Sequence, residues 1–171
     1  GFTMKARMET MRTLGPTLAP LSAFLLLQGI ETLHLRMPRH CESALAVARH
    51  LSAHPAVEWV NYPLLPGNRY EPLARRYLPQ GAGGIVTFGV RGGAAAGERL
   101  IEAVQFLSHL ANIGDAKTLV IHPASTTHRQ LEADEQRAAG VTPAMIRLSV
   151  GLESLDDILW DLDQALEKSQ Q

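Results

Sequence analysis

The chain has 171 residues, and 16 Lys or Arg stand against 17 Asp or Glu, which gives a formal net charge of −1. Apolar residues make up 46% and charged residues 19%, a globular composition that excludes disorder for most of the chain. The balanced charge argues against nucleic-acid binding by bulk electrostatics, which needs a basic excess. The length suits one domain of ordinary size with an appended arm.

Two further features concern the compartment and the extent of the chain. The single cysteine, Cys41, cannot form an intrachain disulfide, which fits a reducing, cytoplasmic compartment. The longest apolar run, residues 18–30, is shorter than the ~20 residues of a membrane-spanning helix, so we predict a buried helix and no membrane partner. Because the chain opens on Gly1-Phe2-Thr3 without an initiator methionine, we interpret it as a fragment of a longer protein.

Helices are expected first. Residues 3–13 predict a helix that ends at Gly15, and a second helix begins near Pro20. This second helix is apolar nearly all round, so we expect it to be covered on several sides. A third helix runs from about residue 40 to 54, and Pro38 would kink it if the two are continuous. Its predicted inner stripe is Cys41, Leu45, Ala48 and Leu51.

Short strands and helices then alternate. The strands are expected over residues 57–60, 85–90, 119–121 and 145–150. The helices are expected over residues 71–78, 94–108 (inner stripe Leu100, Val104 and Leu107) and 133–139, the last ended by Gly140. Ser154 and Asp157 predict a capping box for a final helix, whose apolar face is Leu155, Ile158, Leu159, Leu162 and Leu166. This order predicts an α+β fold: a small sheet with helices on one face, preceded by a helical arm.

Most motifs that could carry chemistry favour a structural role. The glycine-rich segment 81–84 precedes its strand, whereas a phosphate-binding loop follows one, so it predicts a turn. His50 and His54 share a helix face, but the sequence places no third ligand, and we predict no metal site. Cys41 is expected to be a small core residue rather than a nucleophile, and His122 to have a local structural role. The aspartates of the last helix predict a solvated face: Asp156, Asp157, Asp161 and Asp163.

Arg147 is the exception. In residues 145–150, alternation puts Ile146 and Leu148 on one face of the strand and Arg147 with Ser149 on the other. An arginine at such a position either faces water on the open side of a sheet or waits in a cleft for a carboxylate, which its planar guanidinium binds through two parallel hydrogen bonds. The residues alone leave these two alternatives equal.

Four segments together resemble the pyridoxal-phosphate-dependent enzymes of cysteine and methionine metabolism. They are FLLLQGIETL (24–33) followed by RMPRHC (36–41), SHLANIGDAKTL (108–119), HPASTTH (122–128) and IRLSVGLE (146–153). The form NIGD at 112–115 most resembles the O-acetylhomoserine sulfhydrylase branch. The resemblance implies the C-terminal part of a type I aminotransferase-like fold, with residues 1–36 as an arm and linking helix from a missing large domain and residues 37–171 as the C-terminal small domain.

The resemblance also implies an activity for the full-length protein. It would be a transferase of methionine biosynthesis that converts O-acetylhomoserine and sulfide, or a thiol, to homocysteine, or methionine, and acetate. The pyridoxal 5′-phosphate would be bound mainly by the missing domain, and the full-length enzyme would be a homotetramer. The alternatives are a cystathionine γ-synthase or methionine γ-lyase relative, or a non-catalytic stand-alone binding domain.

Site residues follow from the resemblance as well. Arg147 sits where the family clamps the substrate α-carboxylate, Asn112 helps to hold it, and Ser125 and Thr126 border the side-chain pocket or else stabilise their loop. The family's Schiff-base lysine lies in a Ser/Thr-rich segment upstream, a setting that no lysine here has: Lys5, Lys117 and Lys168. We therefore expect no catalytic and no cofactor-binding residue in this chain, and no activity from it alone.

Overall fold

The computed structural model describes residues 1–171. They divide into two compact units, Gly1–Leu35 and Arg36–Gln171. None of the helices is both long and apolar enough to cross a membrane.

The regular structure of the first unit is entirely helical, with a non-helical segment at residues 15–19. Helix α1 (Phe2–Lys5), a π-helical stretch (Ala6–Met11) and α2 (Arg12–Leu14) follow one another, and the run ends at Gly15, whose φ of 63° suits glycine. Helix α3 (Pro20–Glu31) starts with proline in its first turn, where the missing N–H costs nothing. Both predicted helices are therefore confirmed.

The apolar side chains of α3 are exposed rather than covered. At least 56% of each accessible surface faces solvent for Leu21, Phe24, Leu25, Leu26, Leu27 and Ile30. The expectation that α3 is covered on several sides is thus wrong for this chain, and no residue of the helix is buried.

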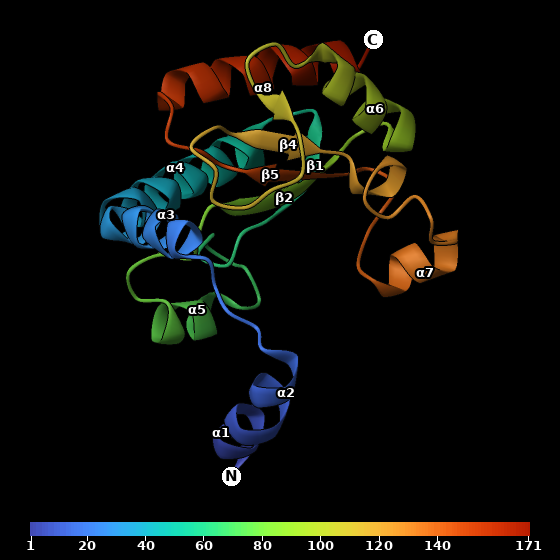
Figure 1. The fold of residues 1–171 in the computed structure, drawn as a ribbon. Coiled ribbons are helices and arrows are strands. Elements are labelled where there is room, and N and C mark those ends of the chain that lie inside the picture. The colour runs from blue at the N-terminus through green and yellow to red at the C-terminus, as the bar shows by residue number, and fades with distance from the viewer. The chain divides into compact units, whose positions relative to one another are not determined.

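The second unit is built on one mixed sheet of five strands (Figure 1), β1 (Val57–Asn61), β2 (Ile85–Val90), β3 (Ser108–His109), β4 (Leu119–Ile121) and β5 (Met145–Ser149). The strand order is β1-β2-β5-β4-β3, and only the β3–β4 pair is parallel. All four predicted strands are confirmed, whereas β3 was not predicted because two residues are too few to show alternation.

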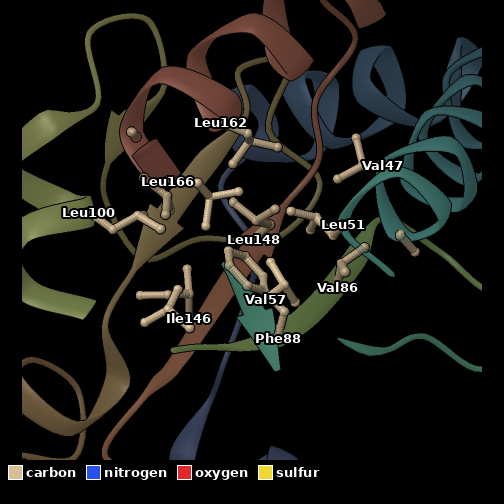
Figure 2. Close-up of a cluster of buried hydrophobic side chains, with 14 of the residues drawn as sticks. Val47, Leu51, Val57, Val86, Phe88, Leu100, Ile146, Leu148, Leu162 and Leu166 are labelled. Atoms are coloured by element: carbon tan, nitrogen blue, oxygen red, sulfur yellow. The ribbon is translucent and has the colours of Figure 1, made fainter. Parts of the chain in front are cut away.

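The core lies on one face of this sheet, under three helices: α4 (Leu33–Ala53), α6 (Gly93–Ala103) and α8 (Leu155–Ser169). Figure 2 shows their side chains converging on the strands; those fully buried include Val47 and Leu51 of α4, Leu100 of α6, Leu162 and Leu166 of α8, and Val86, Phe88, Ile146 and Leu148 of the sheet. Each such side chain contributes about 1.5–3 kcal/mol through burial. The predicted α+β class, with helices on one face, is confirmed.

Two helices differ from their predicted extent or phase. Helix α4 starts at Leu33 and contains Pro38, and Cys41 and Leu45 are only partly buried. Its buried positions are His40, Ser43, Ala44, Val47, Ala48 and Leu51, a stripe that hydrophobicity misplaces because two of its members are polar. Helix α6 ends at Ala103 instead of 108, so Val104 and Leu107 do not belong to a helical stripe.

The capping of two helices differs from the prediction. Ser154 precedes α8 but makes no side-chain capping bond, so the predicted capping box is wrong. A capping box does form at α7 (Ala133–Ala138), between Glu132 and Glu135, and Gly140 follows with a φ of 79°. The predicted helix at 71–78 is α5 (Glu71–Tyr77).

Candidate functional site

Arg147 lies on the face of the sheet opposite the core. Its neighbours Ile146 and Leu148 are fully buried among the helices, so alternation turns Arg147 the other way, level with Thr87 of β2 and Ile121 of β4. Its half-buried side chain lines a depression formed with Leu110, Ala111, Asn112, Leu119, Ile121 and Ser149.

The guanidinium of Arg147 has no acidic partner in the chain. The ion pairs of the molecule involve other residues, and its one hydrogen bond runs from Nη2 to the carbonyl oxygen of Asn112, at 3.2 Å. A half-buried cation with unused donors can bind an anion, and a guanidinium fork matches a carboxylate.

Asn112 meets Arg147 through its backbone. Its side-chain Oδ1 accepts the backbone N–H of the next residue, Ile113, at 2.9 Å, and so stabilises the turn locally. The structure therefore brings Asn112 and Arg147 together, with the carbonyl oxygen of Asn112 as the contact.

Ser125 and Thr126 do not line the depression around Arg147. Ser125 ends the 3₁₀ turn Pro123–Ser125, and its Oγ lies 2.8 Å from Nδ1 of His122. The hydroxyl of Thr126 donates to the carbonyl oxygen of His122 at 2.7 Å. These hydrogen bonds stabilise the loop, which was the alternative role expected for both residues.

His122 is the buried centre of that loop. Its Nε2 lies 2.7 Å from the carbonyl oxygen of Pro143, which can only accept, so Nε2 carries the proton and Nδ1 accepts from Ser125. The ring packs on Gly97 of α6, where an added Cβ would come within 2.9 Å of it. His122 thus links the end of β4 to the segment that enters β5.

The glycine turn at 81–84 is held by Cys41 and Tyr62. The Sγ of Cys41 accepts the N–H of Gly83 at 3.3 Å, and the Tyr62 hydroxyl donates to the Gly83 carbonyl at 3.0 Å. Burial, followed by the charge of Cys41, raises the pKa of Tyr62 to about 12. These contacts give Cys41 and the turn structural roles, although Cys41 lies at the edge of the core.

His50 and His54 have a neighbour that the sequence did not reveal. Asp163 of α8 places Oδ1 2.6 Å from Nε2 of His50 and 4.0 Å from Nε2 of His54. The backbone N–H of Ala56 donates to Nδ1 of His54, so the proton of a neutral His54 is on Nε2, the atom that faces Asp163. One hydrogen bond, between His50 and Asp163, thus links α4 to α8, and His54 lies beside it just after the end of α4.

The prediction of a solvated aspartate face is wrong for Asp161, holds for the exposed Asp156 and Asp157, and holds in part for Asp163, whose side chain is 40% exposed. Asp161 is completely buried. Its carboxylate accepts the backbone N–H groups of Gln105, Phe106 and Leu107, each at 2.8–2.9 Å. These N–H groups serve Asp161 rather than a helix, which explains the early end of α6. Spacing could have revealed it, since Asp161 lies three residues after the buried Ile158 and four before the buried Ala165, and so shares their helix face.

Glu153 was also missed as a functional candidate. Its Oε1 accepts the backbone N–H of Thr118 at 2.6 Å, and its Oε2 accepts the Thr118 hydroxyl at 2.8 Å. That hydroxyl accepts in turn from the N–H of Gly151 at 2.9 Å. Gly151 has no space for a Cβ, which would collide with the carbonyl oxygen of Ala116.

Comparison with known proteins identifies one family and relatives within it. A family model described as Cys/Met metabolism PLP-dependent enzyme matches residues 1–167. An O-acetyl-L-homoserine sulfhydrylase from Leptospira meyeri is 52% identical, over 97% of this chain and 38% of its own length. A homocysteine synthase from Schizosaccharomyces pombe is 48% identical, over 97% of this chain and 39% of its own.

A solved structure agrees with the sequence relatives. It is assigned as an O-acetylhomoserine (thiol)-lyase from Campylobacter jejuni and contains N′-pyridoxyl-lysine-5′-monophosphate. It superposes with a TM-score of 0.89 at 44% identity, over 97% of this chain and 39% of that one. The chain thus spans about two fifths of the length of the relatives that it matches.

Proposed function

Because the chain belongs to the family of Cys/Met metabolism PLP-dependent enzymes, we propose that it is the C-terminal part of a transferase that converts O-acetylhomoserine and sulfide to homocysteine and acetate. A thiol in place of sulfide would give methionine directly. The observation that carries the proposal is the half-buried Arg147, which has no acidic partner and lines a depression on the open face of the sheet. The names of the relatives support the choice of amino acid and sulfur donor.

The residues of this chain do not form a cradle for pyridoxal phosphate. All three lysines are exposed: Lys5 pairs with Glu9, Lys117 lies in a loop, and Lys168 lies in the last turn of α8. None lines the depression around Arg147. We therefore assign the cofactor and the bond-breaking groups to a large domain outside this chain, with residues 1–36 as the arm and linking helix and residues 37–171 as the small domain.

The part that this chain plays is to bind and orient the amino acid. The carboxylate of the substrate would accept two parallel hydrogen bonds from Arg147, while the carbonyl of Asn112 holds one further N–H of the guanidinium and fixes its plane. A substrate held by such a fork has a fixed Cα direction, and orientation of this kind is a large rate contribution in enzymes. The loop that contains Ser125 and Thr126 would border the side-chain end of the substrate, and the hydrogen bonds of these two residues to His122 would hold that loop in place.

We further propose a cytoplasmic homotetramer. Its support is the free thiol of Cys41, which suits a reducing compartment, and the strongly apolar surface of α3, which is of the kind that subunits or domains cover.

A comparison of three substrates with the full-length protein tests the proposed function. O-acetyl-L-homoserine, O-succinyl-L-homoserine and L-methionine are each supplied with sulfide, and homocysteine, cleaved acid and 2-oxobutyrate are measured. The proposal expects homocysteine with the highest kcat/KM from O-acetyl-L-homoserine. Preference for the succinyl ester or for methionine would assign the protein to a neighbouring reaction, and inactivity on all three would leave a binding domain.

A further inference from the structure

The segment that carries Asn112 cannot hold its own position. Residues 109–117, which we call the 109–117 loop, are exposed except for the partly buried Asp115. Its internal hydrogen bonds are local: Ile113 N–H to the Asn112 side chain and Lys117 N–H to the Asp115 side chain. Without burial of apolar surface, the placement of the loop depends on what holds its ends.

The two ends of the loop meet in a buried neck. Leu107 and Thr118 are 5% and 0% exposed, and the N–H of Ser108 donates to the Thr118 carbonyl at 3.0 Å. Strands β3 and β4 form their short parallel pair here. A two-residue pairing gives few hydrogen bonds, so further contacts must fix the neck.

Asp161 holds the incoming side of this neck. From within α8 its buried carboxylate accepts three successive backbone N–H groups, those of residues 105–107, and Gln164 donates to its Oδ1 at 2.8 Å. Hydrogen bonds to a charged acceptor are the strong ones, and a cluster of buried N–H groups left without it would be costly.

Glu153 holds the outgoing side. It binds both the N–H and the hydroxyl of Thr118, and the hydroxyl receives the N–H of Gly151, so every donor in this small network has an acceptor. The same segment adds a backbone bond from Leu152 N–H to the Ala116 carbonyl at 2.8 Å. Only Val150 separates residues 151–153 from the end of β5, so the strand that carries Arg147 is tied to the outgoing end of the loop.

We infer that Asp161 and Glu153 are positioning residues for the carboxylate-binding site. By holding the two sides of the neck, they keep the carbonyl of Asn112 on the guanidinium of Arg147 and so set the direction of its free donors. The kinetic consequence rests on the proposed function, whereas the structural part concerns this chain alone.

The test compares Glu153→Gln and Asp161→Asn with the control Asp157→Asn, an exposed carboxylate of the same helix, in the full-length protein. The amide introduced by Glu153→Gln offers Thr118 one acceptor oxygen instead of two. We expect the KM for O-acetyl-L-homoserine to rise about tenfold, the effect of one lost hydrogen bond to a charged group, with kcat within about twofold. The control should change neither constant.

Hydrogen exchange provides a readout that does not depend on activity. In Glu153→Gln the hydrogen-bonded amides of the neck, those of Ser108, Thr118 and Leu152, should exchange about tenfold or more faster, while core amides such as Val86 and Leu148 keep their rates. Thr118→Val, which removes the hydroxyl that Glu153 binds and keeps the shape, should show the same pattern, so the exchange test does not depend on the folding of Asp161→Asn.

The outcomes separate the two proposals. If the unmodified full-length protein is inactive on every amino acid, the proposed function is contradicted. The hydrogen-exchange rates of the variants then decide whether the carboxylates hold the loop. Unchanged exchange in Glu153→Gln and Thr118→Val would overturn the inference that Glu153 holds the neck of the loop. Faster exchange with an unchanged KM in an active enzyme would reduce both carboxylates to structural residues and overturn the positioning role.

Discussion

Replacing Arg147 by lysine separates a carboxylate clamp from a charge that merely faces water. The native guanidinium donates one N–H to the Asn112 carbonyl and has others free for a ligand. A lysine keeps the charge but concentrates its donors on a single nitrogen. It cannot hold the carbonyl and also give a carboxylate two parallel hydrogen bonds.

The expected size follows from the lost bond. A hydrogen bond between charged groups contributes about 1.5–3 kcal/mol, and tenfold in an equilibrium constant corresponds to about 1.4 kcal/mol. Losing one arm of the fork should therefore raise KM for O-acetyl-L-homoserine roughly 10- to 150-fold. Folding stability should change little, because Arg147 has no ion pair to lose and is only half-buried.

Steady-state kinetics of the full-length protein at saturating sulfide measure this effect. Arg49→Lys, at an exposed position of α4, is the matched control and should behave as the parent. A KM for Arg147→Lys within twofold of the parent value would refute the assignment of Arg147 to the substrate carboxylate.

Three further predictions follow from the structure. Gly151→Ala should raise KM more than tenfold and destabilise the protein by about 1–3 kcal/mol in denaturant titration, because the added Cβ would collide with the backbone of Ala116 and Lys117. The control Gly29→Ala should be tolerated, because a Cβ there meets no atom within 4 Å. The pKa of Tyr62 is raised to about 12 in the folded state, from 10 in the unfolded state, so between these values the folded state holds a proton that the unfolded state has lost. The free energy of unfolding should therefore fall as the pH rises from 10 to 12. Tyr62→Phe should remove this fall from pH-dependent unfolding curves. Borohydride reduction of this chain mixed with pyridoxal phosphate should give no stoichiometric pyridoxyl-lysine by mass spectrometry, and a single fully modified lysine would contradict the assignment of the cofactor to another domain.

Local patterns were enough for most of the second unit. Strand β5 was predicted from alternation, and the same alternation set Arg147 against the core residues Ile146 and Leu148. Helix α8 followed from its apolar face, which packs on the sheet as expected. In both cases the decisive signal lies within a few residues, where the period of the side chains fixes which face is buried.

What the sequence could not show depends on distant partners. The end of α6 is set by Asp161, more than 50 residues further along the chain, which takes the N–H groups that would otherwise continue the helix. The stripe of α4 was misplaced because His40 is buried, with Nδ1 2.7 Å from the Val150 carbonyl, a pairing that hydrophobicity does not register. The contact of Asn112 with Arg147 uses a carbonyl, which any residue type would present.

The charge of Arg147 is available to a ligand because no acid pairs with it, and the two carboxylates that hold the neck are already occupied. Glu153 follows the same strand closely, yet both of its oxygens are taken by Thr118, and Asp161 is filled by backbone N–H groups and Gln164. An acid with a free oxygen beside the guanidinium would neutralise it and compete with a ligand. Neutral donors satisfy both carboxylates. Glu153 and Asp161 therefore hold the 109–117 loop without neutralising the guanidinium of Arg147, whose free donors the loop helps to orient.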